Sequence, residues 1–63
     1  MDLELARKCR ELRINKKLSY RQFADRCGLK IETIKEYEKG VSIIPPRILR
    51  EYEKLVDTLE NNN

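Results

Sequence analysis

The side chains that could do chemistry in this sequence are mostly cations and carboxylates. Six basic residues lie between Arg7 and Lys17, against Glu11 alone, and the net charge is +3. A block of this kind attracts anions, although it can also be an ordinary solvated helix face. The chain has no histidine, no nucleophile–base constellation and no glycine-rich phosphate loop. We therefore expect a binding protein and not an enzyme.

The two cysteines, Cys9 and Cys27, do not change this expectation. Without a histidine they cannot complete a plausible zinc site, so we predict no metal. Each lies on the apolar stripe of a predicted helix, where a free thiol behaves as a small hydrophobic group. We therefore predict two reduced core thiols, and we see no sign of a cofactor or a small-molecule ligand.

The stretch from Ser19 to Gly40 organises the elements that must position the charged residues. It predicts two short helices, 20–27 and 31–39, separated by Gly28. Ser19 is a favourable N-cap, and the two glycines suit left-handed positions at the helix ends. Two helices joined by so short a turn must cross steeply, which defines a helix-turn-helix.

Helices are also predicted on both sides of this motif. The first covers residues 2–13, with a core stripe of Leu5, Cys9 and Leu12. The last covers residues 46–60, and residues 61–63 should fray. We expect an all-α fold: one compact four-helix domain at residues 1–60. The absence of a long apolar run or a leader-like segment predicts a cytoplasmic protein without a membrane span.

The order and spacing of these residues resemble the phage repressor and Cro type of helix-turn-helix regulators. The resemblance covers about residues 5–56 and implies a lambda-repressor-like domain. The positions that carry it are Phe23-Ala24, Gly28-Leu29, Ile34, Tyr37, Lys39-Gly40, Pro46 and Ile48-Leu49, together with Arg13 and Glu38. In that family a basic–acidic pair often braces the first helix against the second helix of the motif, which implies this role for Arg13 and Glu38.

The resemblance implies that the helix at 31–39 lies in the major groove of DNA. Lys35 could then reach a guanine edge or a phosphate, Glu32 could accept from a cytosine, and Ile31 could contact a thymine methyl. The implied base-contacting residues are Lys30, Ile31, Glu32, Lys35 and Glu36, and the implied phosphate-contacting residues are Tyr20, Arg21, Gln22, Lys39 and Arg47. As alternatives, the helix face could be merely solvated, and Arg47 could pair with Glu51.

We therefore expect a small sequence-specific transcriptional regulator, repressor-like, that binds a palindromic double-stranded DNA operator as a homodimer. The alternative is a helix-turn-helix fold that binds a protein, such as an antirepressor or a repressor partner. In that case Glu32 and Glu36 would dock onto a basic surface.

A dimer needs a surface, and two segments are unusually apolar for exposed positions. We assign Ile48, Leu49 and Tyr52 mainly to the core of the domain. The predicted two-fold interface consists of Val41, Ile43, Ile44, Leu55, Val56 and Leu59.

Overall fold

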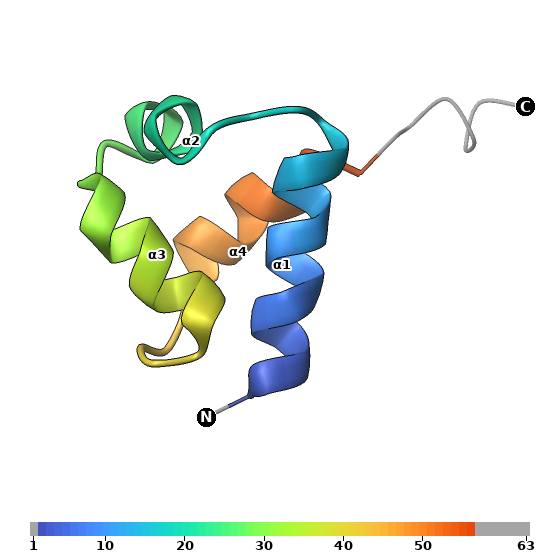
Figure 1. Ribbon diagram of the computed structural model, residues 1–63, viewed down its shortest axis with the longest axis vertical. Helices are drawn as coiled ribbons and strands as arrows, with labels where there is room; N and C mark the ends of the chain where they lie inside the picture. The colour runs from blue at the N-terminus through green and yellow to red at the C-terminus, as the bar shows by residue number, and fades with distance from the viewer. Residues whose placement is uncertain (1, 57–63) are drawn as a thin grey trace, which may run out of the picture.

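The computed structural model describes residues 2–56 and contains four α-helices and, in that range, no strand. In Figure 1, α1 (Leu3–Asn15) and α3 (Ile31–Lys39) stand side by side. α4 (Pro46–Glu53) lies behind them, and α2 (Tyr20–Cys27) crosses at one end. The predicted all-α four-helix fold with a central helix-turn-helix is confirmed.

The helix α1 begins and ends later than the sequence predicted. Asp2 is its N-cap and not its first residue, because the Asp2 carboxylate accepts a hydrogen bond of 3.0 Å from the amide of Leu5. At the other end the helix continues past Arg13 to Asn15. It stops because Lys17 takes a left-handed conformation, with φ 59°, and lets the Leu18 amide reach the Arg13 carbonyl.

The central motif has the predicted bounds. Ser19 caps α2 through its hydroxyl, and Gln22 returns the contact to the Ser19 amide, which completes a capping box. Gly28 ends α2 at φ 69° and Gly40 ends α3 at φ 77°, so both occupy the left-handed region that favours glycine. The amide of Leu29 then bonds to the Ala24 carbonyl at 2.9 Å, which fixes the turn.

The helix α4 is shorter than predicted. Pro46 is its first residue, a position that proline favours because no N–H is needed there. The helix ends at Glu53 instead of Glu60. The chain then turns, because the amide of Leu55 bonds to the Tyr52 carbonyl. The predicted frayed tail at 61–63 and Leu59 lie outside the described residues.

Side chains from all four helices meet in one core. Phe23, Ile34, Ile48 and Tyr52 are almost completely buried, and the rings of Phe23 and Tyr52 lie 4.2 Å apart. Cys9 and Cys27 are both buried, as predicted for core residues, and no disulfide joins them in this structure. Leu5 and Leu12 are only partly buried, whereas Ala6, which was not predicted, is buried on α1. The core therefore joins α1 and α4 to the two helices of the motif.

The predicted interface needs two corrections. Ile44 and Leu55 are buried in the core of the domain, with 8% and 4% of their surfaces exposed, so the assignment of these two residues to a dimer surface is wrong. The remaining members that the structure describes are also separated. The loop with Val41 and Ile43 precedes α4 and Val56 follows it, so they lie toward opposite ends of that helix (Figure 1). They do not form one patch.

Candidate nucleic-acid interface

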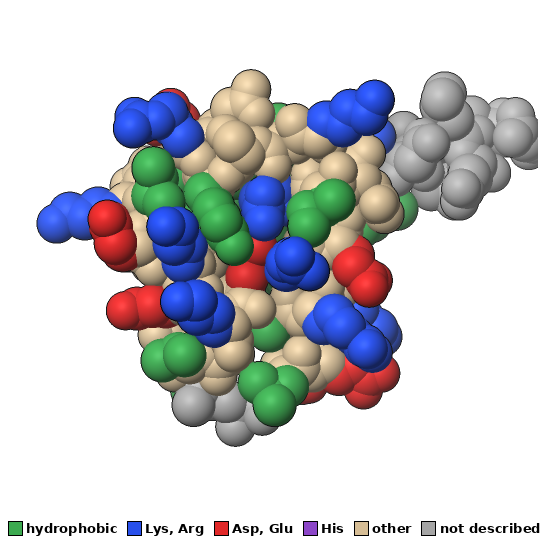
Figure 2. Space-filling model, in the orientation of Figure 1, with side chains coloured by type: hydrophobic (Ala, Val, Ile, Leu, Met, Phe, Trp, Pro, Cys, Tyr) green, Lys and Arg blue, Asp and Glu red, His purple; other side chains and the backbone are tan. Residues whose placement is uncertain are grey.

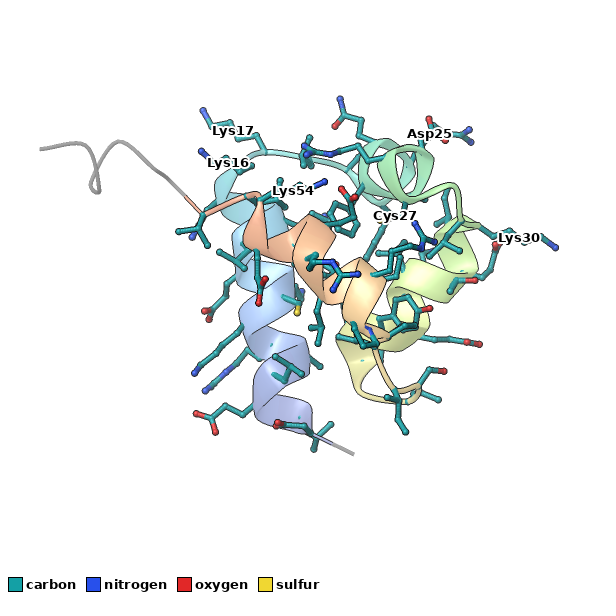
Figure 3. All side chains as sticks on the ribbon, turned by 180° about the vertical axis from the view of Figure 1, so that it is seen from behind. Lys16, Lys17, Asp25, Cys27, Lys30 and Lys54 are labelled. Carbon is teal, nitrogen blue, oxygen red and sulfur yellow. The ribbon has the colours of Figure 1, made fainter. Side chains whose placement is uncertain are left out.

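The helix α3 presents one charged face to solvent. Core packing of Ile34, Tyr37 and Glu38 turns the opposite face outward. Ile31 is half-buried and packs against the core, so it contributes less to the outer face than was expected. The exposed candidates are Lys30, Glu32, Lys35, Glu36 and Lys39. In Figure 3, Lys30 points away from the domain at the start of α3, and it makes no side-chain cap.

The first turn of α2 adds three candidates of different character. Arg21 is exposed and lies beside the positive end of the helix dipole, where an anion is favoured. Gln22 is exposed, but its carbonyl oxygen is engaged in the capping box at 2.8 Å from the Ser19 amide. Tyr20 is half-buried and packs against the core. Arg21 is thus the most available of the three.

Arg47 links the start of α4 to the end of α2. Its guanidinium donates a hydrogen bond of 3.3 Å to the carbonyl of Cys27, the last residue of α2. Glu51, its suggested partner along α4, instead forms an ion pair with Lys54 at 3.2 Å. Arg47 is exposed, so it remains near solvent while it ties the start of α4 to α2.

A buried polar network holds α3 in place. Arg13 of α1 donates three hydrogen bonds to the Glu38 carboxylate, at 2.9 to 3.1 Å, and a fourth to the Leu18 carbonyl at 2.7 Å. Tyr52 of α4 donates to the same carboxylate at 2.7 Å. The Arg13–Glu38 pair implied by the resemblance is therefore present, with a third member. Sequence reasoning missed Tyr52 as this third member. It could have been found because a buried tyrosine hydroxyl needs a hydrogen-bond partner.

The network leaves no buried polar group unsatisfied. In the part of the chain that the structure describes, every buried side-chain nitrogen and oxygen has a hydrogen-bond partner. The hydrogen bond to Glu38 raises the pKa of Arg13, so its charge is permanent. Burial, followed by the hydrogen bond to Glu38, raises the pKa of Tyr52. Arg13 and Tyr52 thus both stay protonated and donate to one carboxylate, which fixes α3 against α1 and α4.

The charges over α1 and α3 are unevenly distributed. In Figure 2, Lys and Arg side chains gather over the faces of both helices that are turned to the viewer, and most Asp and Glu side chains lie toward the edges of that view. The exposed charges on α3, its N-cap and the first turn of α2 comprise four cations, Lys30, Lys35, Lys39 and Arg21, and two carboxylates, Glu32 and Glu36. The net charge of this surface therefore favours an anionic partner.

Comparison with known families agrees with this geometry. A family model described as helix-turn-helix matches residues 10–58, which include all of the motif, Arg13 and α4. The chain belongs to the helix-turn-helix family. This is a family of DNA-binding regulatory domains and not of enzymes. No curated protein and no solved structure matches the chain.

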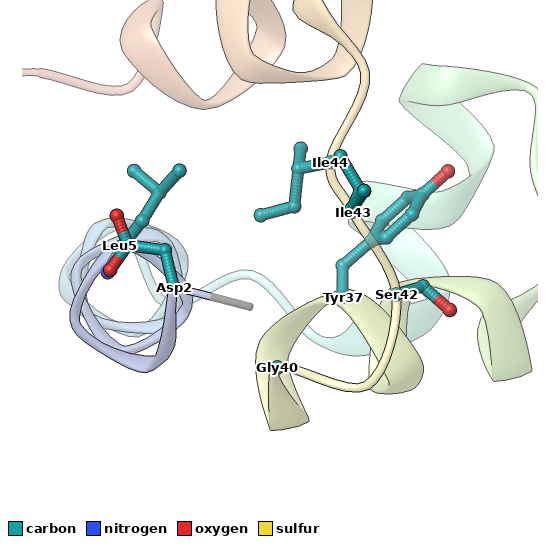
Figure 4. Close-up of a pocket in the computed structure, with 7 residues that line it drawn as sticks. All are labelled: Asp2, Leu5, Tyr37, Gly40, Ser42, Ile43 and Ile44. Carbon is teal, nitrogen blue, oxygen red and sulfur yellow. The ribbon is translucent and has the colours of Figure 1, made fainter.

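A cavity lies between α1 and the loop after α3 (Figure 4). It has a volume of about 160 Å³ and is lined by Asp2, Leu5, Tyr37, Gly40, Ser42, Ile43 and Ile44. Figure 4 shows Leu5 and Ile44 pointing into the space between α1 and the loop after α3. Leu3, Val41 and Ile43 are exposed beside it. This "loop patch" of Leu3, Val41 and Ile43 is apolar, unlike the face of α3.

Residues 2–56 contain neither a metal-binding cluster nor a membrane-spanning helix. In that range no cluster of three or more cysteine and carboxylate side chains is placed to hold a metal ion. None of the helices described there has both the length and the apolar character that a bilayer crossing requires.

Proposed function

We propose that this helix-turn-helix domain is a sequence-specific transcriptional regulator that places α3 in the major groove of DNA. The observation that carries the proposal is the charged outer face of α3 beside the first turn of α2. The buried Arg13–Glu38–Tyr52 network holds that face in place. A rigidly held recognition helix with phosphate-binding groups next to it is the docking geometry of this motif.

The proposal includes two kinds of contact, to base edges and to phosphates. Lys35, Glu32 and Lys30 reach base edges, with Ile31 and Glu36 at the margin of the groove. Arg21, Lys39 and Arg47 neutralise phosphates, and Tyr20 and Gln22 lie beside Arg21 as uncharged hydrogen-bonding neighbours. Phosphate contacts supply affinity and orientation, and base contacts supply sequence preference.

The proposal also includes a two-fold dimer on a palindromic operator, because one domain of this size contacts only one half-site. Two predicted members, Val41 and Ile43, stay exposed in the loop patch, whereas the exposed Val56 follows α4 at its other end, and we place the two-fold contact on the loop patch. Ile43, with 82% of its surface exposed, projects beside the cavity of about 160 Å³. A patch that carries both a projecting apolar side chain and an apolar hollow suits a two-fold contact, in which the same surface meets itself.

The test of DNA binding is a fluorescence anisotropy titration against salt, after selection of bound sequences from a random DNA pool. Enrichment of a palindrome, with log K falling steeply against log salt, would support the proposal. No binding to any duplex at ~50 mM salt would contradict it. That result would favour a protein partner for the exposed carboxylates Glu32 and Glu36.

Dimerisation is tested separately by sedimentation of the chain with and without the selected DNA. Ile43→Glu should prevent assembly and cooperative binding without loss of helical content, because Ile43 is exposed. Val56→Glu, at the far end of α4, is the matched control and should leave assembly intact. An unmutated chain that stays monomeric on a palindromic site would contradict the dimer.

A further inference from the structure

The ring of Tyr20 lies against two cations that have different surroundings. The guanidinium carbon of Arg13 is 4.1 Å from the ring centroid, and the Nζ of Lys35 is 5.5 Å from it. Both distances are within the range of about 6 Å in which a cation is attracted to an aromatic face. One tyrosine on α2 therefore connects a residue of α1 with a residue on the outer face of α3.

Arg13 and Lys35 differ in the conformational freedom of their side chains. Arg13 is buried, and four hydrogen bonds to Glu38 and to the Leu18 carbonyl fix its guanidinium. Because Tyr20 packs on this fixed group and is itself half-buried, its ring has a defined position. Lys35 is exposed, and a lysine side chain in solvent samples many rotamers.

We propose that Tyr20 is a positioning residue for Lys35: its ring, fixed by Arg13, holds the Lys35 ammonium group at the DNA-facing surface of α3. This inference rests on the proposed function and assigns Tyr20 a role other than a phosphate contact through its hydroxyl. A side chain that is ordered before binding loses less entropy when the complex forms. The gain appears in DNA affinity and in discrimination at the base that Lys35 contacts.

The contact itself is tested in the free protein, without DNA. The side-chain protons next to the Lys35 ammonium group should show NMR shifts displaced upfield by the ring current of Tyr20. Tyr20→Phe should keep the displacement, and Tyr20→Leu should abolish it. Shifts of a freely rotating lysine in the unmutated chain would overturn the proposal.

The effect on recognition is tested with a double-mutant cycle on the selected DNA. Tyr20→Leu should weaken binding about two- to fivefold, which is the range for an exposed cation–aromatic contact. It should have no further effect in a Lys35→Ala background, but should retain its full effect in a Lys39→Ala background, the matched control. An equal loss in all three backgrounds would reduce Tyr20 to a structural role and overturn the proposal.

Tyr20→Phe separates the two roles of the residue. Positioning by the ring predicts nearly unchanged affinity, whereas a phosphate contact through the hydroxyl predicts a clear loss. Upfield Lys35 shifts in a chain that binds no DNA would overturn the proposed function while the contact stands. Free-lysine shifts in a chain that does bind DNA would overturn the positioning role alone.

Discussion

The Nε atom of Arg13 lies 2.9 Å from a carboxylate oxygen of Glu38, although 25 residues separate them in the sequence. Both side chains are almost fully buried. A buried ion pair adds little net stability compared with apolar residues, but removal of one partner leaves an uncompensated charge. The pair therefore matters chiefly for the placement of α3.

We expect Arg13→Met and Glu38→Leu each to lower the free energy of unfolding by about 3–5 kcal/mol. That is most of the stability of a domain of this size, so urea melts are best run with a stabilising osmolyte. The double variant should lose much less than the sum of the two. Additive losses would contradict a coupled pair. Lys54→Ala, at the exposed pair with Glu51, is the control and should cost under about 1 kcal/mol.

Lys17 offers a stabilising substitution. A residue with a Cβ atom is strained in the left-handed region, and Lys17 has φ 59°. Lys17→Gly should raise the free energy of unfolding by about 0.5–1 kcal/mol, the strain relieved less the added chain entropy. Lys16→Gly is the matched control, because Lys16 has φ −90° and should gain nothing. Thermal melts compare the two variants, and a stabilised Lys16→Gly with a destabilised Lys17→Gly would refute the expectation.

Gly28 is required for its backbone conformation alone. A Cβ added there would meet no atom within 4 Å, so the cost is that of φ 69°. We expect Gly28→Ala to lower stability by about 1–2 kcal/mol. Gly28→Asn should recover part of the loss, because asparagine tolerates this region better. Urea melts measure both, and equal losses for alanine and asparagine would point to a cause other than the backbone.

Cys9 gives the domain a dependence on alkaline pH. Burial, and then the charges of Glu38 and Glu53, raise the pKa of Cys9 from 9.0 to about 11. Between these values the unfolded chain releases a proton that the folded chain keeps, so stability is full below pH 9 and falls as pH rises toward 11. The loss from Cys9 should approach about 1.4 kcal/mol per pH unit. Urea melts of the unmutated chain and of Cys9→Ala should differ in this slope, and parallel curves would exclude Cys9 as the cause.

Arg21 should act as a phosphate contact if the proposed function is correct. Arg21→Ala should weaken binding to selected and unrelated DNA alike and lower the slope of log K against log salt by about one. Arg26→Ala removes the same charge from the other end of α2 and should change the slope less. An unchanged slope in Arg21→Ala would remove this residue from the interface.

The sequence by itself determined the local structure of the motif. The Ser19 cap, the two left-handed glycines and the spacing of Phe23 and Ile34 act over a few residues, and both helices of the motif have the predicted bounds. Helix ends governed by other forces were less predictable. The left-handed Lys17 that ends α1 and the early end of α4 at Glu53 carry no glycine or proline to mark them.

Only the tertiary structure decided which apolar side chains are buried in the core and which stay exposed. Apolar periodicity showed that Ile44 and Leu55 need burial, but a core and a dimer interface bury a side chain by the same physical effect, so the pattern could not distinguish them. The second partner of Glu38, Tyr52, and the contact between Tyr20 and Lys35 likewise depend on how α1, α2, α3 and α4 cross. Those crossings follow from long-range packing in the core, which no short stretch of sequence contains.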